Sequence, residues 1–302
     1  MERILLLTDS DCEVLHRPFP LRLLPPRYDR ELWSGRPVKE FVALAKLLRR
    51  GGFQIFPASR PPHLGGREPL EVLKIGKCHP DRDPRLMRQY GSRNLSEWNP
   101  RNLEMMEYFD QYIDLGRKTW YVNLRTGEGQ AQLHHLLHEH GPLFVKSLVK
   151  GHGTIVESAH AYIREFGDLS LVDADSLTLL VSEVIHIREI EAVTGGRRGP
   201  RTDEWRHYVY RGRRVATTHA FECDLRRTSA EYREANVQHA ESVLTKLRGT
   251  DFATSYVLDT CTLEGGGCAV VETNFFFSSG IYDWAALGPI ADAILADPGP
   301  RP

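Results

Sequence analysis

The chain has 302 residues and a formal net charge of −1, and 41% of its residues are hydrophobic. This composition excludes a disordered or fibrous protein, and the length is sufficient for two domains that each bury a core. A charge so close to zero provides no global field that would attract nucleic acid or an anionic membrane, so neither is expected as a partner.

The beginning of the chain and its cysteines bear on the cellular compartment. The N-terminal apolar run is short and breaks into acids, and no stretch approaches the roughly 20 apolar residues that a membrane helix needs. The five cysteines are scattered without a CxxC pair, which suits a reducing compartment. They are Cys12, Cys78, Cys223, Cys261 and Cys268. We therefore expect a cytoplasmic protein in which Cys261 and Cys268 remain packed thiols.

The N-terminal region predicts an α/β lobe with parallel strands. Its apolar patterns predict a strand over Arg3–Thr8, a helix over Val38–Arg50 and a second strand over Phe53–Phe56. Residues 58–84 are rich in proline and glycine and predict loop, with one short segment near Leu70–Ile75. A helix is expected over Leu103–Tyr112, and the boundary between two domains, 1–115 and 116–302, follows it.

The next region predicts a helix, a hairpin and a strand. A helix over Gln130–His140 places His134 and His138 one turn apart, which permits a metal site or, as we prefer, a solvated polar face. Strands are predicted over Tyr121–Leu124, over 143–146 and over 154–156, with glycines between the last two. A helix over 159–166 and a buried strand over 177–181 follow.

Residues 188–203 form a charged insertion that predicts a mobile loop. It contains four arginines around a Gly-Gly pair, which suits either a solvated loop or attraction of an anionic group. Downstream, residues 204–216 predict a strand, a glycine turn and a second strand. Helices are expected over 228–246, with Thr228 or Ser229 as the N-cap, and over 285–295.

The stretch 252–282 carries the strongest signal of chemistry. Two apolar, β-branched runs flank Glu264-Gly-Gly-Gly267, which is typical of an antiparallel hairpin. If the turn is symmetric about its first two glycines, Leu263 faces Cys268 and Asp259 lies opposite Glu272. Asn274 then shares their face, because side chains on a strand repeat every second residue.

Two facing carboxylates repel, and a cation relieves that repulsion. Mg²⁺ takes oxygen ligands from one or two carboxylates and completes its shell with water and substrate phosphates, so Asp259, Glu272 and Asn274 are candidate ligands. The alternative is that both acids point into solvent on an edge hairpin.

The string Asp259, Glu272-Thr-Asn274, Phe-Phe-Phe-Ser278-Ser-Gly280 resembles the metal-binding end of the ATP-grasp superfamily. It is most similar to small bacterial and phage members related to the cell-division-cycle assembly chaperone family. The resemblance implies a mixed α/β (α+β) protein, with an N-terminal pre-grasp lobe before an ATP-grasp domain. That domain would have one sub-lobe at about 125–187 and a metal-binding sub-lobe at about 204–302.

The same resemblance assigns roles to residues in the family's order. It implies ATP and Mg²⁺ as cofactors and Asp259, Glu272 and Asn274 as metal ligands, with Asn274 also close to the nucleotide. Lys146 would bind phosphate and Arg206 would stabilise the transferred phosphoryl group. The nucleotide's adenine and ribose would contact a separate set, namely Glu183, the Val184 and Ile185 backbone, and Glu204.

Two positions depart from the family pattern. A second nucleotide-binding lysine has no clear counterpart, with Lys118 as a candidate, and Phe275 replaces the proline that usually follows Glu-x-Asn. The implied activity is ATP-dependent ligation of a carboxylate to an amine, with small-molecule or peptide substrates or a protein substrate. The alternatives are an ATP-binding assembly chaperone without ligase chemistry and a grasp fold that survives as a binding module.

Overall fold

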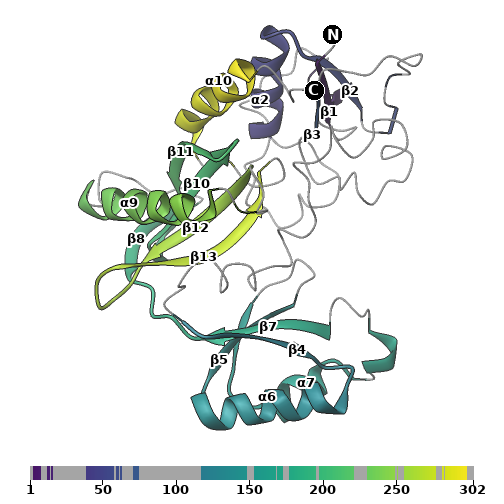
Figure 1. Ribbon diagram of the computed structural model, residues 1–302, viewed down its shortest axis with the longest axis vertical. Coiled ribbons are helices and arrows are strands. Elements are labelled where there is room, and N and C mark those ends of the chain that lie inside the picture. The colour runs from purple at the N-terminus through teal and green to yellow at the C-terminus, as the bar shows by residue number, and fades with distance from the viewer. Residues whose placement is uncertain are drawn as a thin grey trace.

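The computed structural model describes residues 3–7, 12–13, 15, 39–57, 59–60, 62, 71–74, 117–147, 153–167, 169–172, 177–194, 197–220, 230–248, 250, 255–276, 281 and 283–297. Four sheets organise this part of the chain (Figure 1). None of its helices is long and apolar enough to cross a membrane. The predicted helix over Leu103–Tyr112 lies outside the described residues.

A small parallel sheet forms the N-terminal part, as predicted. Its strands β1 (Arg3–Leu7), β2 (Gln54–Pro57) and β3 (Glu71–Lys74) lie in the order β2-β1-β3. Helix α2 (Lys39–Arg50) connects β1 to β2 and packs against the C-terminal helix α10 (Leu287–Ala296). The two ends of the chain thus share one hydrophobic core.

The largest antiparallel sheet has the order β11-β10-β12-β13. Its strands are β10 (Glu204–Tyr210), β11 (Arg213–His219), β12 (Tyr256–Thr262) and β13 (Cys268–Phe275). Helix α9 (Ala230–Leu247) covers one face, where the apolar residues of both elements form a core. Helices α2 and α10 pack against part of the opposite face, and the remainder of that face carries the polar residues described below.

A second antiparallel sheet, β4-β7-β5-β6, lies across from the first in Figure 1. Its strands are β4 (Thr119–Asn123), β5 (Leu143–Ser147), β6 (Thr154–Val156) and β7 (Thr178–Glu183). Helices α6 (Gly127–His140) and α7 (Ala159–Glu165) cover its outer face, and a short 3-10 helix, Leu169–Leu171, follows α7. The inner face is therefore turned toward the larger sheet.

The predicted mobile loop at 188–203 is wrong. The structure has a two-stranded hairpin there, formed by β8 (Glu189–Thr194) and β9 (Arg197–Thr202). The Arg188 N–H donates to the Thr262 carbonyl and the Thr262 N–H donates to the Asp203 carbonyl, so both ends are fixed to the main sheet. The alternating Glu-Ile-Glu-Ala-Val-Thr pattern of β8 was the signal for a strand.

Smaller differences occur at the helix ends. Helix α6 begins at Gly127 because the Thr126 side chain accepts a hydrogen bond from the Gly129 N–H, which caps the helix. The C-terminal helix is divided into a 3-10 turn, Trp284–Ala286, and α10. Of the cysteines that the structure describes, Cys12, Cys261 and Cys268 are free thiols, as predicted for the last two.

A polar network is buried between the large sheet and α9. His207 is 0% exposed and lies 3.0 Å from the Thr217 hydroxyl through Nδ1 and 2.9 Å from the Thr260 hydroxyl through Nε2. Thr260 donates to Asn236 Oδ1 on α9. The Nε2–H of a neutral imidazole therefore donates to Thr260, while Nδ1 accepts from Thr217.

We expect His207 to make stability fall in mild acid. Burial, together with nearby Arg214, lowers the pKa of His207 from 6.5 to about 3. Below pH 6.5 His207 is therefore protonated in the unfolded chain but stays neutral in the folded chain. Its contribution to the free energy of unfolding is complete above pH 6.5 and is lost as the pH falls toward 3. Urea unfolding should show about 2–3 kcal/mol lost between pH 6.5 and 4.5 from this group.

The variant His207→Gln provides the comparison, because its amide keeps a donor and an acceptor without titrating. The difference in unfolding free energy between wild type and variant should shrink as the pH falls. A difference that stays constant across this range would contradict the buried neutral imidazole.

Candidate active site

The hairpin of β12 and β13 closes through three residues, where two were predicted. The Leu263 N–H donates to the Gly267 carbonyl, and Thr262 pairs with Cys268. Gly266 and Gly267 have φ values of 87° and 83°, a left-handed conformation that glycine adopts without a Cβ clash. The predicted pairing of Leu263 with Cys268 is therefore wrong by one residue.

A β-bulge in β13 cancels this offset. Thr260 pairs with Val270, but Asp259 pairs with Glu272, so Val271 is an extra residue on β13. Beyond the bulge the ladder follows the predicted register, and the expected pairing of Asp259 with Glu272 is confirmed. The bulge thus brings Glu272 onto the face where Asp259 lies.

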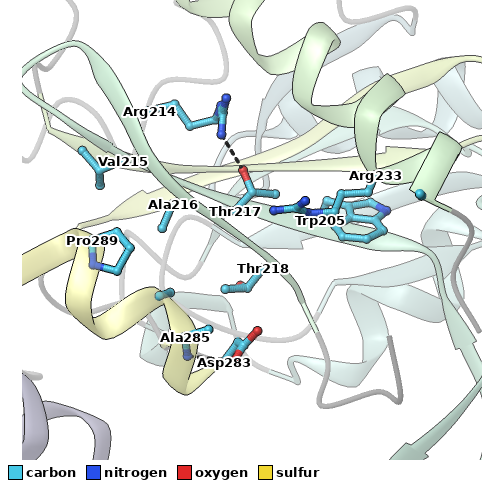
Figure 2. Close-up of a pocket in the computed structure, with 12 residues that line it drawn as sticks. Trp205, Arg214, Val215, Ala216, Thr217, Thr218, Arg233, Asp283, Ala285 and Pro289 are labelled. Carbon is cyan, nitrogen blue, oxygen red and sulfur yellow. Dashed lines mark hydrogen bonds between the residues drawn. The ribbon is translucent and has the colours of Figure 1, made fainter. Parts of the chain in front are cut away.

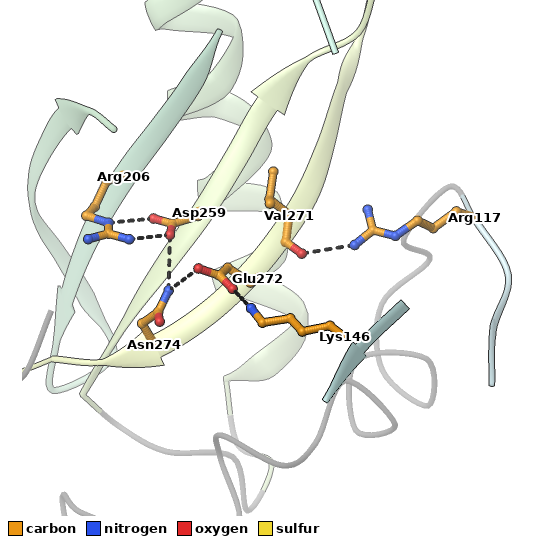
Figure 3. A network of polar contacts seen from close by, with 7 residues as sticks. All are labelled: Arg117, Lys146, Arg206, Asp259, Val271, Glu272 and Asn274. Carbon is orange, nitrogen blue, oxygen red and sulfur yellow. Dashed lines mark hydrogen bonds and ion pairs between the residues drawn. The ribbon is translucent and has the colours of Figure 1, made fainter. Parts of the chain in front are cut away.

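Arg117, just before β4, holds the bulge from the other sheet. Its Nη1 lies 2.5 Å from the Val270 carbonyl oxygen. Its Nη2 lies 2.9 Å from the Val271 carbonyl oxygen (Figure 3). One guanidinium therefore binds both carbonyls at the irregular position. Sequence reasoning missed Arg117, because no local pattern indicates a contact with a strand so far along the chain.

Five polar side chains meet on this face (Figure 3). Arg206 donates to both oxygens of Asp259, with Nε 2.8 Å from Oδ1 and Nη2 2.6 Å from Oδ2. Asn274 Nδ2 donates to Asp259 Oδ2 at 3.1 Å and to Glu272 Oε1 at 2.8 Å. Lys146, from β5 in the opposite sheet, forms an ion pair with Glu272 Oε2. The network therefore bridges the two sheets.

The two carboxylates have pKa values shifted in opposite directions. Burial raises the pKa of Asp259, and the Arg206 guanidinium opposes this rise. Burial acts in the same direction on Glu272, but Lys146 and the hydrogen bond from Asn274 outweigh it, so the pKa of Glu272 lies below its ordinary value. Arg206 and Lys146 therefore offset the negative charges of the two carboxylates, which would otherwise repel each other.

Glu204 lies beside this network, two residues before Arg206 on β10 and therefore on the same face of the sheet. Burial raises the pKa of Glu204, and a hydrogen bond donated by the Thr202 hydroxyl opposes that rise. Asp259 and Glu272 raise it further through their negative charge. Glu204 is therefore brought into the same electrostatic environment as the predicted metal ligands.

Glu183 is not brought together with these residues. Its carboxylate accepts from the Lys118 N–H at 3.0 Å and lies 3.8 Å from His140, on the face of the small sheet that α6 covers. Val184 and Ile185 follow β7 where the chain passes toward the large sheet. Lys118 lies immediately before β4, and its carbonyl accepts a hydrogen bond from the Glu183 N–H.

The remaining candidates lie apart or outside the described residues. His134 and His138 line a surface depression between α6 and α7, and no three His, Cys, Asp or Glu side chains in the described part of the chain are arranged to hold a metal ion. The glycine tip at 150–152 and the segment 278–280 lie outside the described residues.

The donor set on the β12–β13 hairpin fits Mg²⁺ chemically. It offers two carboxylates and one amide oxygen, and Mg²⁺ usually takes one or two carboxylates and completes its shell with water and phosphate. Asp259 Oδ1 accepts one hydrogen bond from Arg206, so it retains a second acceptor site. Asn274 would present its amide oxygen after a rotation that exchanges its oxygen and nitrogen.

No family model matches the sequence, and no curated protein sequence matches it. Solved structures do match. A RimK domain ATP-grasp protein from Sphaerobacter thermophilus is 15% identical and matches with a TM-score of 0.54, covering 97% of this chain and 100% of that chain. The ATP-grasp ligase PsnB, complexed with a variant of its minimal precursor, Mg and ADP, is 11% identical at a TM-score of 0.54, covering 98% and 97%.

A third match is N5-carboxyaminoimidazole synthetase from Staphylococcus aureus, complexed with ADP. It is 8% identical at a TM-score of 0.60, covering 100% of this chain and 79% of that chain. These likenesses extend over nearly the whole chain. The protein therefore has the ATP-grasp fold, and the mixed α/β architecture expected from the sequence is confirmed.

Proposed function

We propose that the protein is an ATP-dependent carboxylate–amine ligase that uses Mg²⁺. The observation that carries this proposal is the cross-sheet network, in which two carboxylates on paired strands lie beside Asn274, Arg206 and Lys146. The substrate carboxylate would attack the γ-phosphorus of ATP to give an acylphosphate and ADP. The amine would then displace phosphate and leave an amide.

The chain's contribution to this reaction is positioning and charge compensation. Asp259, Glu272 and Asn274 would hold Mg²⁺, which when bound neutralises phosphate charge. Lys146 would exchange its contact with Glu272 for the nucleotide phosphates, a point charge suited to that role. Arg206 would stabilise the transferred phosphoryl oxygens with its planar donor fork.

The nucleotide would lie between the two sheets. Glu204 is proposed to bind the ribose, and the backbone of Val184 and Ile185 to bind the adenine edge. Because the Glu183 carboxylate contacts the Lys118 N–H, its proposed contribution to adenine is through its backbone. The division into a pre-grasp lobe, 1–115, and a grasp domain, 116–302, belongs to this proposal, with small molecules, peptides or a protein as substrates.

Mg²⁺-dependent ATP binding and turnover test the proposal in a screen of amino acids and short peptides. Release of ADP and phosphate that depends on a particular acid and amine would support a ligase and identify its substrates. Tight Mg·ATP binding without turnover would favour the assembly chaperone alternative. Failure to bind ATP would contradict both functions.

We expect Arg117→Met to lower turnover by about 10- to 100-fold with little change in global stability, because partners behind a metal ligand commonly have effects of this size. The variant keeps most of the aliphatic stem and removes the donors to the Val270 and Val271 carbonyls. Steady-state ADP release as a function of Mg²⁺ concentration is the measurement. The defect should appear mainly as a higher Mg²⁺ requirement, and an unchanged requirement would show that the bulge holds without Arg117.

A further inference from the structure

The linker from the small sheet to the large sheet pairs with the end of β12. It comprises residues 184–188, between β7 and β8. Ile187 forms an antiparallel bridge with Leu263, the residue that follows β12. The Glu264 N–H donates to the His186 carbonyl at 3.0 Å. The linker therefore lies beside the tip of the β12–β13 hairpin as a short additional strand.

A triangle of backbone hydrogen bonds fixes the end of the linker at Arg188. The Arg188 N–H donates to the Thr262 carbonyl at 2.9 Å, and the Thr262 N–H donates to the Asp203 carbonyl at 3.0 Å. The Asp203 N–H donates to the Arg188 carbonyl at 2.8 Å. Asp203 is 0% exposed and Thr262 is 3% exposed, so these bonds are shielded from water. The contacts of 186–188 with 262–264, which we call the linker junction, are therefore held by backbone groups.

The linker junction connects two parts of the proposed nucleotide site. Val184 and Ile185, whose backbone is proposed to bind the adenine edge, directly precede the junction. Asp259, a proposed Mg²⁺ ligand, lies four residues before Leu263. A strand advances about 3.3 Å per residue, so about 13 Å of chain separates Leu263 from Asp259. The adenine-binding backbone and a metal-binding carboxylate are thus attached to the same strand.

We propose that the linker junction fixes the distance between the adenine-binding backbone and the Mg²⁺ ligands, so that both bind one nucleotide as a rigid unit. This inference rests on the proposed function, because it concerns the same nucleotide site. The Glu264 N–H is then a positioning group that acts through the linker. Fixing two contact regions at the correct separation before binding lowers the entropic cost for a ligand that spans both. A ligand that contacts one region alone gains nothing from the junction.

The variant Glu264→Pro removes one bond of the junction and preserves the turn. The Gly266 N–H donates to the Leu263 carbonyl at 3.0 Å, which places Glu264 at the second position of a β-turn. Proline is favoured there because its fixed, negative φ suits that position. Glu264 and His186 are exposed, so water can replace the lost hydrogen bond at the His186 carbonyl. Glu264→Ala keeps the N–H and is the matched control.

Calorimetry with a non-hydrolysable ATP analogue and Mg²⁺ tests the effect on nucleotide binding, with adenosine and Mg·tripolyphosphate as half-ligands. Glu264→Pro should bind the analogue about three- to tenfold more weakly than Glu264→Ala, a factor that corresponds to the loss of one hydrogen bond. Both variants should bind each half-ligand equally well. A general loss of structure would weaken the binding of all three ligands.

Val215→Ala is a control for stability. Val215 is partly buried against the N-terminal core and lines a cavity of about 500 Å³ along β11 (Figure 2). β10 separates β11 from β12 in the large sheet, so this cavity lies apart from the linker junction. The variant should lower the melting temperature while leaving the affinities for all three ligands unchanged.

Hydrogen exchange of the nucleotide-free protein tests the junction separately from ATP binding. The amides of residues 184–188 should exchange about three- to tenfold faster in Glu264→Pro than in Glu264→Ala, while those of β10 remain protected. Unchanged linker exchange, or an equal loss of affinity for the analogue and the half-ligands, would overturn the inference. Failure of the wild type to bind the ATP analogue, with the exchange result as expected, would contradict the proposed function and with it the nucleotide role of the junction.

Discussion

Replacing Glu272 by glutamine is expected to lower Mg²⁺-dependent ATP turnover by about 10²- to 10³-fold, the range found when one preorganised charge-stabilising group is lost. The amide has the same shape but cannot neutralise Lys146 or a divalent cation. Glu272 also accepts hydrogen bonds from two sides, from Asn274 and from Lys146. The substitution therefore removes the negative charge whose ion pair with Lys146 joins the two sheets.

The measurement is the rate of ADP release over a range of Mg²⁺ concentrations, combined with thermal unfolding. The side chain of Glu272 is 29% exposed, so the variant should remain folded. Glu264→Gln is the matched control because Glu264 is an exposed carboxylate on the turn of the same hairpin. Equal turnover and equal Mg²⁺ dependence in the two variants would contradict the proposed role of Glu272.

Replacing Asp259 by alanine is expected to produce the largest loss of stability, about 3–5 kcal/mol, because it removes the carboxylate that pairs with a buried guanidinium. Asp259 is 3% exposed and Arg206 is 7% exposed, and two short hydrogen bonds join them. Without the carboxylate, Arg206 would remain in a site that excludes most water. Urea unfolding monitored by circular dichroism measures this loss.

A double variant, Arg206→Met with Asp259→Leu, separates stability from activity. Replacing a buried ion pair by apolar residues of similar size is often neutral, so most of the stability should return. ATP turnover should remain absent, because both proposed roles are lost. A single Asp259→Ala variant that loses less than about 1 kcal/mol would show that the pair is solvated, as surface pairs are.

The local patterns of the sequence predicted most of the elements around the site. A few adjacent residues are enough to show the apolar runs of β1, β5 and β12 and the helical spacing of α2 and α9. The folded protein buries these apolar faces, so the elements form where the patterns predict them. The hairpin and its Asp259–Glu272 pair also followed from local chemistry, since glycines indicate the turn and alternation sets the face. The pair was predicted from a turn one residue too short, and the bulge at Val271 corrected that error.

Contacts between distant segments were not predictable in this way. The β8–β9 hairpin was mistaken for a mobile loop because its ends are fixed through Arg188 and Asp203 to strands elsewhere in the chain. The sequence predicted Glu183 as a nucleotide residue, but it did not indicate that α6 would pack on the face of β7 that carries the Glu183 carboxylate. In both cases the decisive contacts are made with segments distant in the sequence, so local patterns did not reveal them.

The sequence by itself determined which residues could carry the chemistry, namely the carboxylates, the amide, the lysine and the arginine on apolar strands. Only the tertiary structure decided that Lys146 reaches Glu272 across two sheets and that Arg117 holds the bulge. It also decided that the linker at 186–188 pairs with the tip of the β12–β13 hairpin. The physical reason is that periodicity fixes the direction of a side chain within its own element, whereas packing of the elements fixes what that side chain meets.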